Sequence, residues 1–308
     1  MATIMKPNLY HNIVLLISLF FSFDLQADVT IPGDGFRPAQ SGCEILWSGD
    51  VEQLPESLPN YSAKAHRFSR KTINYFKTLG GLSDKFKVPP LEHWGVSKEH
   101  ERYDDDTTSL SVAPNSGSLQ YYCIQSHEKY SLVDAPAPEV AKEMTIKILK
   151  DLDLQLPAIS FDKARFTTET STRFNRALGK PVTRPCGVRM FVPRLYEGYP
   201  SNEGGITAQY GYGGEIIEFA ICWREVELAG RRKVPSRDEI AKQIQEGRVT
   251  MMMDAAQNAN KLTIKKISII YREAAMFRKD DTVEPILFIN ADADVGGIIS
   301  DCTIYLKL

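Results

Sequence analysis

The stretch from residue 261 to residue 292 constrains the fold of this chain more than any other. It reads KLTIKKISIIYREAAMFRKDDTVEPILFINAD, two runs rich in β-branched residues on either side of a charged segment. Such runs are typical of two strands that return beside one another as a hairpin. Directly before it, Ser236 and Glu239 form a capping-box pattern and Gly247 is a stop signal. The sequence therefore predicts a short helix followed by a long hairpin.

A helix followed by strands is predicted twice more along the chain. Residues 62–79 predict a helix before a hairpin at 110–125, whose turn is Asn115-Ser116-Gly117. Residues 138–153 place Val140, Met144, Ile148 and Leu152 at four-residue spacing, the stripe of a helix that needs a sheet to bury it. The strands predicted after it are residues 164–172, 188–195, 206–212 and 215–227. Tight turns between strands favour antiparallel pairing, so the predicted fold class is α+β, with two or three helix-on-antiparallel-sheet units.

The N-terminus predicts export. Lys6 precedes an apolar run from residue 13 to residue 23, and the small residue Ala27 follows. This order is typical of a secretory signal peptide at residues 1–27, with cleavage between Ala27 and Asp28. The run is shorter than the about 20 residues that span a membrane, and no second long run follows. We therefore expect a secreted or periplasmic protein with no membrane span in the mature chain.

The remaining chain predicts two lobes. Residues 126–136 end in VDAPAP, which is typical of a linker. We assign residues 28–133 to an N-terminal arm and a first α+β lobe, and residues 134–308 to a second lobe. The second lobe is either one unit or two helix-plus-sheet repeats, at 134–230 and 231–308.

Charge and cysteine content narrow the function classes. A net charge of −2 leaves no positive footprint of the kind that nucleic acids require, so we expect no nucleic-acid partner. The five cysteines have no zinc-site spacing, and their odd number leaves at least one unpaired within the chain. Cys186 and Cys222 both border strands of the middle segment, which favours a disulfide between them. The alternative is five buried, reduced cysteines.

Three segments together resemble a known family. Ser236–Glu246 form the predicted helix, residues 264–271 end in Ile-Ile-Tyr, and residues 283–290 read VEPILFIN. This order is similar to PepSY-like modules of extracytoplasmic regulators of bacterial sensor kinases, in which a helix packs across a small antiparallel sheet, a cystatin-like arrangement. The resemblance implies a secreted, non-enzymatic binding or regulatory protein. It implies a protein or peptide partner, no cofactor and no catalytic residues.

Aromatic residues of the middle segment are the candidate binding residues. Aromatic side chains concentrate in recognition patches, and this segment would carry several on the exposed side of its sheet. The candidates are Tyr196, Tyr199, Tyr210, Tyr212 and Trp223. The alternative is that they pack on alternate faces of their strands.

A rival hypothesis is an extracytoplasmic hydrolase or metal-dependent enzyme that uses the loop at residues 92–106. His93, His100, Asp104 and Asp106 lie in this loop, and imidazole and carboxylate ligands suit divalent metals. The alternative for these residues is a solvated loop. No Gly-x-Ser-x-Gly pattern marks a nucleophile, so the sequence leans away from an enzyme.

Overall fold

The computed structural model describes the chain in eight segments. They are residues 43–49, 51–84, 87–88, 100–123, 135–175, 178–252, 259–273 and 282–308. The predicted signal peptide, its cleavage point and His93 lie outside the described residues. Among the described helices, none combines the length and the apolar character needed to cross a membrane.

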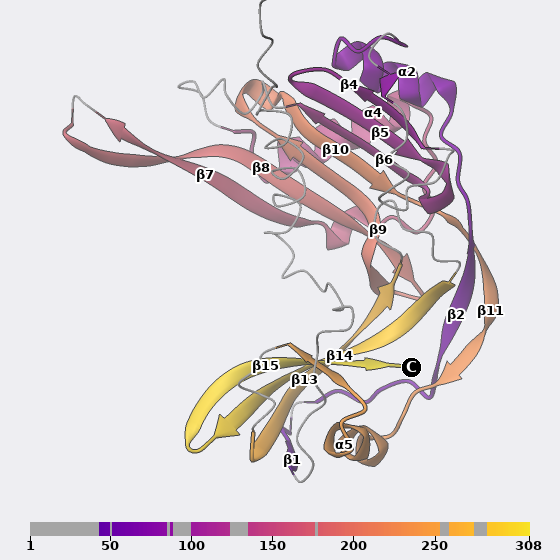
Figure 1. The fold of residues 1–308 in the computed structure, drawn as a ribbon, viewed down its shortest axis with the longest axis vertical. Coiled ribbons are helices and arrows are strands. Elements are labelled where there is room, and N and C mark those ends of the chain that lie inside the picture. Colours follow the sequence, from indigo (N-terminus) through magenta and orange to yellow (C-terminus); the bar gives the residue numbers. More distant parts are fainter. Residues whose placement is uncertain are drawn as a thin grey trace, which may run out of the picture.

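The described chain forms two lobes connected by a two-stranded ribbon (Figure 1). The upper lobe contains β3 (Lys87–Val88), β4 (Glu101–Asp104), β5 (Thr108–Ala113), β6 (Ser118–Cys123), β7 (Arg165–Asn175), β8 (Lys180–Tyr196), β9 (Tyr199–Tyr210), β10 (Ile216–Cys222), α2 (Arg70–Leu79) and α4 (Pro138–Asp151). The lower lobe contains β1 (Glu44–Trp47), β12 (Thr250–Met252), β13 (Lys261–Arg272), β14 (Thr282–Val295), β15 (Ile298–Lys307) and α5 (Arg237–Gln245). The ribbon consists of β2 (Ser57–Lys64) and β11 (Glu225–Lys233).

The upper lobe packs α2 and α4 on one face of its sheet. Phe76 of α2 is fully buried and lies with its ring 5.3 Å from that of Phe219 in β10. On α4, the Thr145 hydroxyl lies 2.7 Å from the Tyr210 hydroxyl of β9. These contacts belong to one hydrophobic cluster that includes strands from both sides of residue 134. Strands at residues 101–123, which we assigned to the first predicted lobe, thus share a core with residues 138–223.

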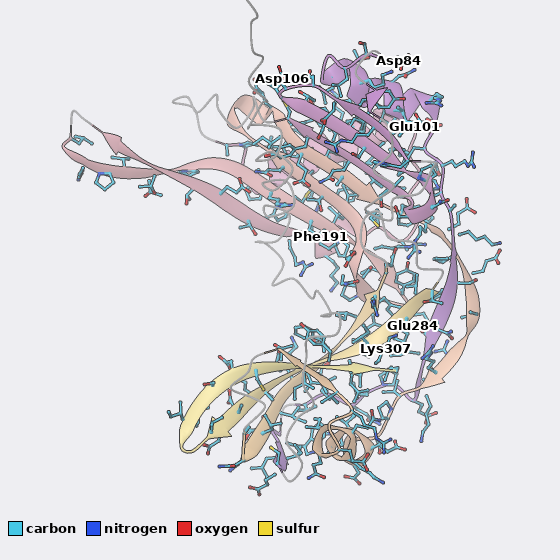
Figure 2. The ribbon with its side chains drawn as sticks, in the orientation of Figure 1. Asp84, Glu101, Asp106, Phe191, Glu284 and Lys307 are labelled. Atoms are coloured by element: carbon cyan, nitrogen blue, oxygen red, sulfur yellow. The ribbon has the colours of Figure 1, made fainter. Side chains whose placement is uncertain are left out.

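The lower lobe is built on the predicted hairpin. β13 and β14 pair antiparallel from Lys261 opposite Asp294 to Arg272 opposite Glu284, which confirms the hairpin at residues 261–292. Alternate residues such as Leu287 and Ile289 are fully buried in the lower core. At the ribbon, the Arg232 guanidinium donates to the Glu284 carboxylate at 2.6 Å, and this carboxylate also pairs with Lys307 at 3.3 Å (Figure 2). The Arg232–Glu284 pair attaches β11 to the hairpin, and the Lys307–Glu284 pair joins β15 to β14.

The predicted fold class is wrong. The described residues contain fifteen strands and only three α-helices, and the strands join into one mixed sheet system with the path β11-β2-β14-β13-β9-β10-β6-β5-β4-β3. β1 and β9 both pair with β13 in parallel. The chain is therefore mostly β rather than α+β, and it is not built from separate PepSY-like or cystatin-like helix-on-antiparallel-sheet units. Helices of 10, 14 and 9 residues are too short to cover strands of up to 17 residues.

The N-terminus of α5 gives a first test of how local sequence stabilises the fold. The Ser236 hydroxyl accepts the backbone N–H of Glu239 at 3.3 Å, and the Glu239 carboxylate accepts the Ser236 N–H at 2.7 Å. Ser236→Ala should lower the free energy of unfolding by about 1 kcal/mol, because it leaves a helix N–H without its partner. Ser160→Ala is the matched control, since Ser160 precedes a short 3-10 turn and makes no capping bond. Urea unfolding followed by circular dichroism measures both, and equal losses would contradict the capping role.

Candidate functional site

Three tyrosine rings meet where the two lobes join. Tyr61 comes from β2, Tyr196 from β8 and Tyr271 from β13. The ring centroids are 5.1 Å apart for Tyr61 and Tyr196, 4.8 Å for Tyr196 and Tyr271, and 6.0 Å for Tyr61 and Tyr271. Next to them, Tyr271 pairs with Ser201 in the parallel bridge between β13 and β9. The ribbon, the upper sheet and the lower hairpin therefore converge at this aromatic cluster.

A buried carboxyl group completes the junction. Glu273 follows β13 directly and is 1% exposed. Its Oε1 accepts a hydrogen bond from the Tyr196 hydroxyl at 2.5 Å, and its backbone N–H donates to Asn202 Oδ1 at 3.2 Å. A Cβ at Gly204 would lie 2.0 Å from Glu273 Oε1, so only glycine leaves room for the carboxyl group. A side chain from the lower hairpin is thus enclosed by β8 and β9 of the upper lobe.

Two buried arginines lie near the junction, and the Arg194 guanidinium is 4.9 Å from the Tyr196 ring centroid. Arg194 is 5% exposed and Arg224 is 1% exposed. Arg194 Nη1 donates to the Arg224 carbonyl at 2.6 Å, and its guanidinium stacks 3.9 Å from the Trp223 ring centroid. Both guanidinium charges act on the Tyr196 hydroxyl, as does the opposite charge of Glu273. All three charges therefore act on one hydroxyl group, which lies where the two lobes meet.

The Tyr196 hydroxyl and the Cys222 thiol at the junction stay protonated at neutral pH. Burial and, to a lesser extent, the Glu273 charge raise the pKa of the Tyr196 hydroxyl above its ordinary value. Burial, with Glu273 as the second cause, raises the pKa of the Cys222 thiol to about 12. A thiol reacts as its thiolate, so Cys222 is poorly suited to nucleophilic chemistry here. The tyrosine cluster and Glu273 are therefore better suited to a structural role, the attachment of one lobe to the other.

The structure disperses the aromatic candidates. Tyr196, Tyr210 and Trp223 are 3%, 0% and 3% exposed. Tyr196 and the half-buried Tyr199 pack with the lower core, whereas Tyr210 and Trp223 belong to the upper core. The side chain of Tyr212 lies outside the described residues. The four described side chains therefore form no single exposed aromatic surface.

The residues of the rival metal-site hypothesis lie in different environments. His100 is 6% exposed, and burial, followed by the Arg102 charge, lowers its pKa. Asp104 is 2.6 Å from Arg102 in an ion pair, and Asp106 lies exposed in the turn between β4 and β5 (Figure 2). Within the described segments, no group of three or more His, Cys, Asp or Glu side chains is placed to hold a metal ion.

The predicted cysteine pair is described at one of its two positions. Cys222 is a buried free thiol, and the Ser118 hydroxyl donates to its sulfur at 3.8 Å. The side chain of Cys186 lies outside the described residues. Cys43 and Cys302 are likewise free thiols.

A polar row crosses the sheet of the upper lobe on the face opposite α2 and α4. Gln209 donates to Glu169 at 2.5 Å, Arg189 pairs with Glu218 at 3.0 Å, and Gln120 donates to Glu218 at 3.2 Å. Burial is the main reason that the pKa of Glu169 is raised. Glu169 belongs to β7 and Gln209 belongs to β9. Their hydrogen bond therefore links β7 to β9 across the intervening strand β8.

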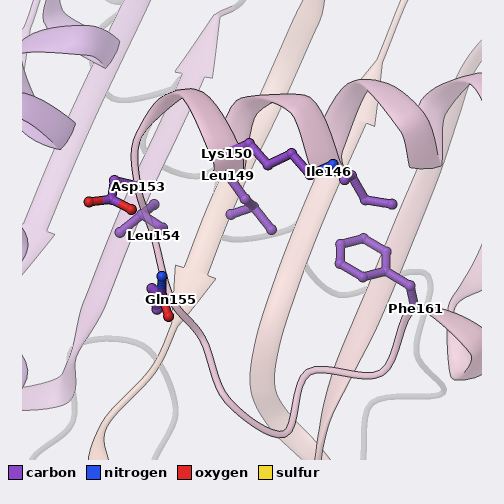
Figure 3. Close-up of a pocket in the computed structure, with 7 residues that line it drawn as sticks. All are labelled: Ile146, Leu149, Lys150, Asp153, Leu154, Gln155 and Phe161. Atoms are coloured by element: carbon purple, nitrogen blue, oxygen red, sulfur yellow. The ribbon is translucent and has the colours of Figure 1, made fainter.

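A shallow pocket lies beside the C-terminal end of α4 (Figure 3). Its volume is about 290 Å³, and Leu149, Leu154 and Phe161 line it together with Lys150 and Asp153. Pockets that enclose drug-sized ligands start at roughly this volume and bury most of the ligand, which an open depression does not do. The pocket therefore gives no basis for a small-molecule site.

Sequence reasoning missed an apolar hairpin tip. β14 and β15 are joined by Gly296 and Gly297, both at positive φ, and Gly297 N–H donates to Asp294 Oδ1 at 2.7 Å. Ile298 and Ile299 follow at 71% and 69% exposure, the highest values of any large apolar side chains in the described residues. The signal was present in the sequence: two adjacent isoleucines after a glycine pair break the alternation of a half-buried strand.

Comparisons with known proteins identify no family. No family model matches the chain, and no curated protein matches it. Ten chains of solved structures match. One is an uncharacterized protein from Eubacterium rectale ATCC 33656, which is 11% identical over 85% of this chain and 86% of that chain, with a TM-score of 0.46. A likeness this distant supports no argument, and the resemblance to PepSY-like modules stays a prediction.

Proposed function

We propose that this chain is an exported, non-enzymatic binding protein that recognises a protein or peptide partner through the tip of the β14–β15 hairpin. The observation that carries the proposal is the adjacent pair Ile298 and Ile299, each more than two-thirds exposed. Burying an isoleucine side chain contributes roughly 1.5–3 kcal/mol, so the pair offers a substantial contact in a small area.

The geometry of the tip indicates the shape of the partner. Adjacent residues of a strand point to opposite faces, so Ile298 and Ile299 present apolar side chains on both sides of the hairpin. A flat partner would bury only one of them. A partner that buries both surrounds the tip, which requires an apolar groove in that partner.

The tip of the β14–β15 hairpin is ordered before any partner binds. Val295 pairs with Ile298 across the Gly296-Gly297 turn, and the two glycine φ angles of 64° and 90° suit a two-residue hairpin turn. Lys265 of β13 pairs with Asp301 of β15 at 2.5 Å, and this ion pair connects β15 to the β13–β14 hairpin. A hairpin that is ordered before binding loses little conformational entropy on binding.

Site-specific photo-cross-linking in the exported fraction tests this function. A photoreactive residue in place of Ile299 should give one defined cross-linked species. An excess of unlabelled wild-type protein should abolish it, whereas an excess of the Ile298→Ser/Ile299→Ser variant should not. The serine variant is expected to stay folded, because both replaced side chains are exposed.

The matched control places the same photoreactive residue at Val140 on α4, another aliphatic side chain that is 47% exposed. It should give no competable species. Cross-links of equal yield from both positions, or none from position 299, would contradict binding at the tip.

A further inference from the structure

The β7–β8 hairpin extends beyond the sheet of the upper lobe as an arm (Figure 1). β8 pairs with β9 only from Val188 onward, so residues 180–187 have β7 as their neighbour among the described strands. β7 pairs with β8 alone in the described sheet. The arm therefore has two outer edges, and each edge carries backbone N–H and C=O groups that a further strand could pair with.

Prolines block one of these edges. Pro181 lies opposite Phe174 and Pro185 lies opposite Thr170. Proline has no N–H, so these pairs fit the ladder only as non-hydrogen-bonded pairs, in which the backbone groups point outward. Thr172 and Thr183 form the pair between them, and their hydroxyl oxygens lie 2.7 Å apart, as the closer side chains of such a pair allow. Of the three outward positions on β8, two therefore lack a donor.

In the described part of the chain, no strand pairs with the other edge. By the same alternation, Thr170, Thr172 and Phe174 direct their N–H and C=O groups away from β8. β7 contains no proline along its whole length from Arg165 to Asn175. An arm with one edge blocked and the other intact is suited to strand addition on the β7 side only.

We propose that the open edge of β7 pairs with the same edge of a second copy of this chain, antiparallel about a two-fold axis at Thr172. In this register, Thr170 lies opposite Phe174 of the second copy, and Thr172 lies opposite Thr172 of the second copy. Each residue whose backbone N–H and C=O groups point away from β8 therefore faces another such residue. About six main-chain hydrogen bonds form. One symmetric contact satisfies both open edges at once, as an isologous interface requires.

The charges along β7 are compatible with a second copy as the occupant. In the proposed register, Glu169 lies opposite Asn175, and Arg173 lies opposite Ser171. No like charges face each other, which would otherwise oppose the pairing. At its base the arm is anchored, because Glu169 accepts a hydrogen bond from Gln209 at 2.5 Å. The inference is independent of partner binding at the β14–β15 tip.

Two proline variants of the full chain test the proposal by sedimentation over a range of concentrations. The wild-type chain should dimerise. Thr172→Pro should weaken the dimer more than about tenfold, because each copy loses its central outward donor. Thr183→Pro is the matched control: it removes the same threonine pair and adds a proline at the same level of the arm, but on the edge that is already blocked. It should leave the dissociation constant within about twofold.

Cysteine cross-linking gives a second readout. Hydrogen-bonded antiparallel partners lie about 5.5 Å apart at Cα, which a disulfide can bridge. Mild oxidation should link Thr172→Cys to a second copy, and should not link Thr183→Cys beyond the background of the native cysteines. A wild-type chain that is monomeric at every concentration would overturn the proposal. Equal weakening by both proline variants, or equal cross-linking by both cysteine variants, would overturn it as well.

Discussion

Gly117→Ala should lower the free energy of unfolding by about 3 kcal/mol or more, a large share of the roughly 5–15 kcal/mol that stabilises a typical domain. Gly117 ends the turn between β5 and β6 at φ 59° and ψ 34°. An added Cβ would lie 1.8 Å from the carbonyl oxygen of Trp223 and 2.6 Å from its carbonyl carbon. Backbone atoms cannot rotate away as a side chain would, so β6 and the end of β10 would have to separate.

The matched control for Gly117 is Gly81→Ala. Gly81 has φ 66° and no atom within 4 Å of the position of an added Cβ. Alanine there meets only the strain of a left-handed backbone, about 1–2 kcal/mol. Guanidinium unfolding monitored by tryptophan fluorescence measures both variants. If the two losses are the same, the close approach between Gly117 and Trp223 does not exist.

Local signals in the sequence were sufficient for several elements. The helix at Arg237–Gln245 was predicted because Ser236 and Glu239 satisfy each other's backbone donors within one turn. The hairpins β5–β6 and β13–β14 were predicted because their strands are close in sequence and end at turn residues. In each case the interactions that stabilise the element lie within about 30 residues of one another.

Elements that depend on distant partners were not predictable in this way. Residues 57–64 were interpreted as part of an extended arm and the start of a helix, but they form β2. Its hydrogen-bond partner is β11, more than 160 residues later. The helix begins instead at Arg70, with Ser69 as its N-cap. Pairing over such separations decides the mixed sheet, and hydrophobic periodicity does not report it.

The predicted stripe of α4 shows a related limit. Val140 is 47% exposed, whereas the buried face contains Ala141 and Thr145. Thr145 is buried because its hydroxyl bonds with Tyr210 and with the Ala141 carbonyl at 2.9 Å. A search for apolar residues at helical spacing passes over a polar residue that finds its partners inside the core.

The junction shows the same limit for the candidate site. Glu273 belongs to the charged segment after β13, which the sequence indicated only as a hairpin turn. Nothing in its neighbours shows that β13 continues into the upper lobe, where Tyr196 and Asn202 receive it. Of the junction tyrosines, only Tyr196 was predicted as a surface residue, because aromatic side chains suit both interfaces and cores. Only tertiary structure distinguishes the two.

Glu273→Ala should lower the free energy of unfolding by about 2–3 kcal/mol, because it leaves the buried Tyr196 hydroxyl without its acceptor and removes a side chain that is 1% exposed. Glu273→Gln keeps the size of the side chain and an acceptor oxygen, so it should recover part of the loss. The three chains, wild type and two variants, are compared by guanidinium unfolding followed by circular dichroism.

Glu227→Ala is the control for removal of a glutamate that pairs with a cation at the surface. Glu227 forms an ion pair with Lys64 across the ribbon, and the two side chains are 63% and 55% exposed. Water screens this pair, so its loss should lower the free energy of unfolding by less than about 1 kcal/mol. If Glu273→Ala is no more destabilising than Glu227→Ala, the buried carboxyl group does not hold the lobes together. The ribbon and the tyrosine cluster would then be enough to join them.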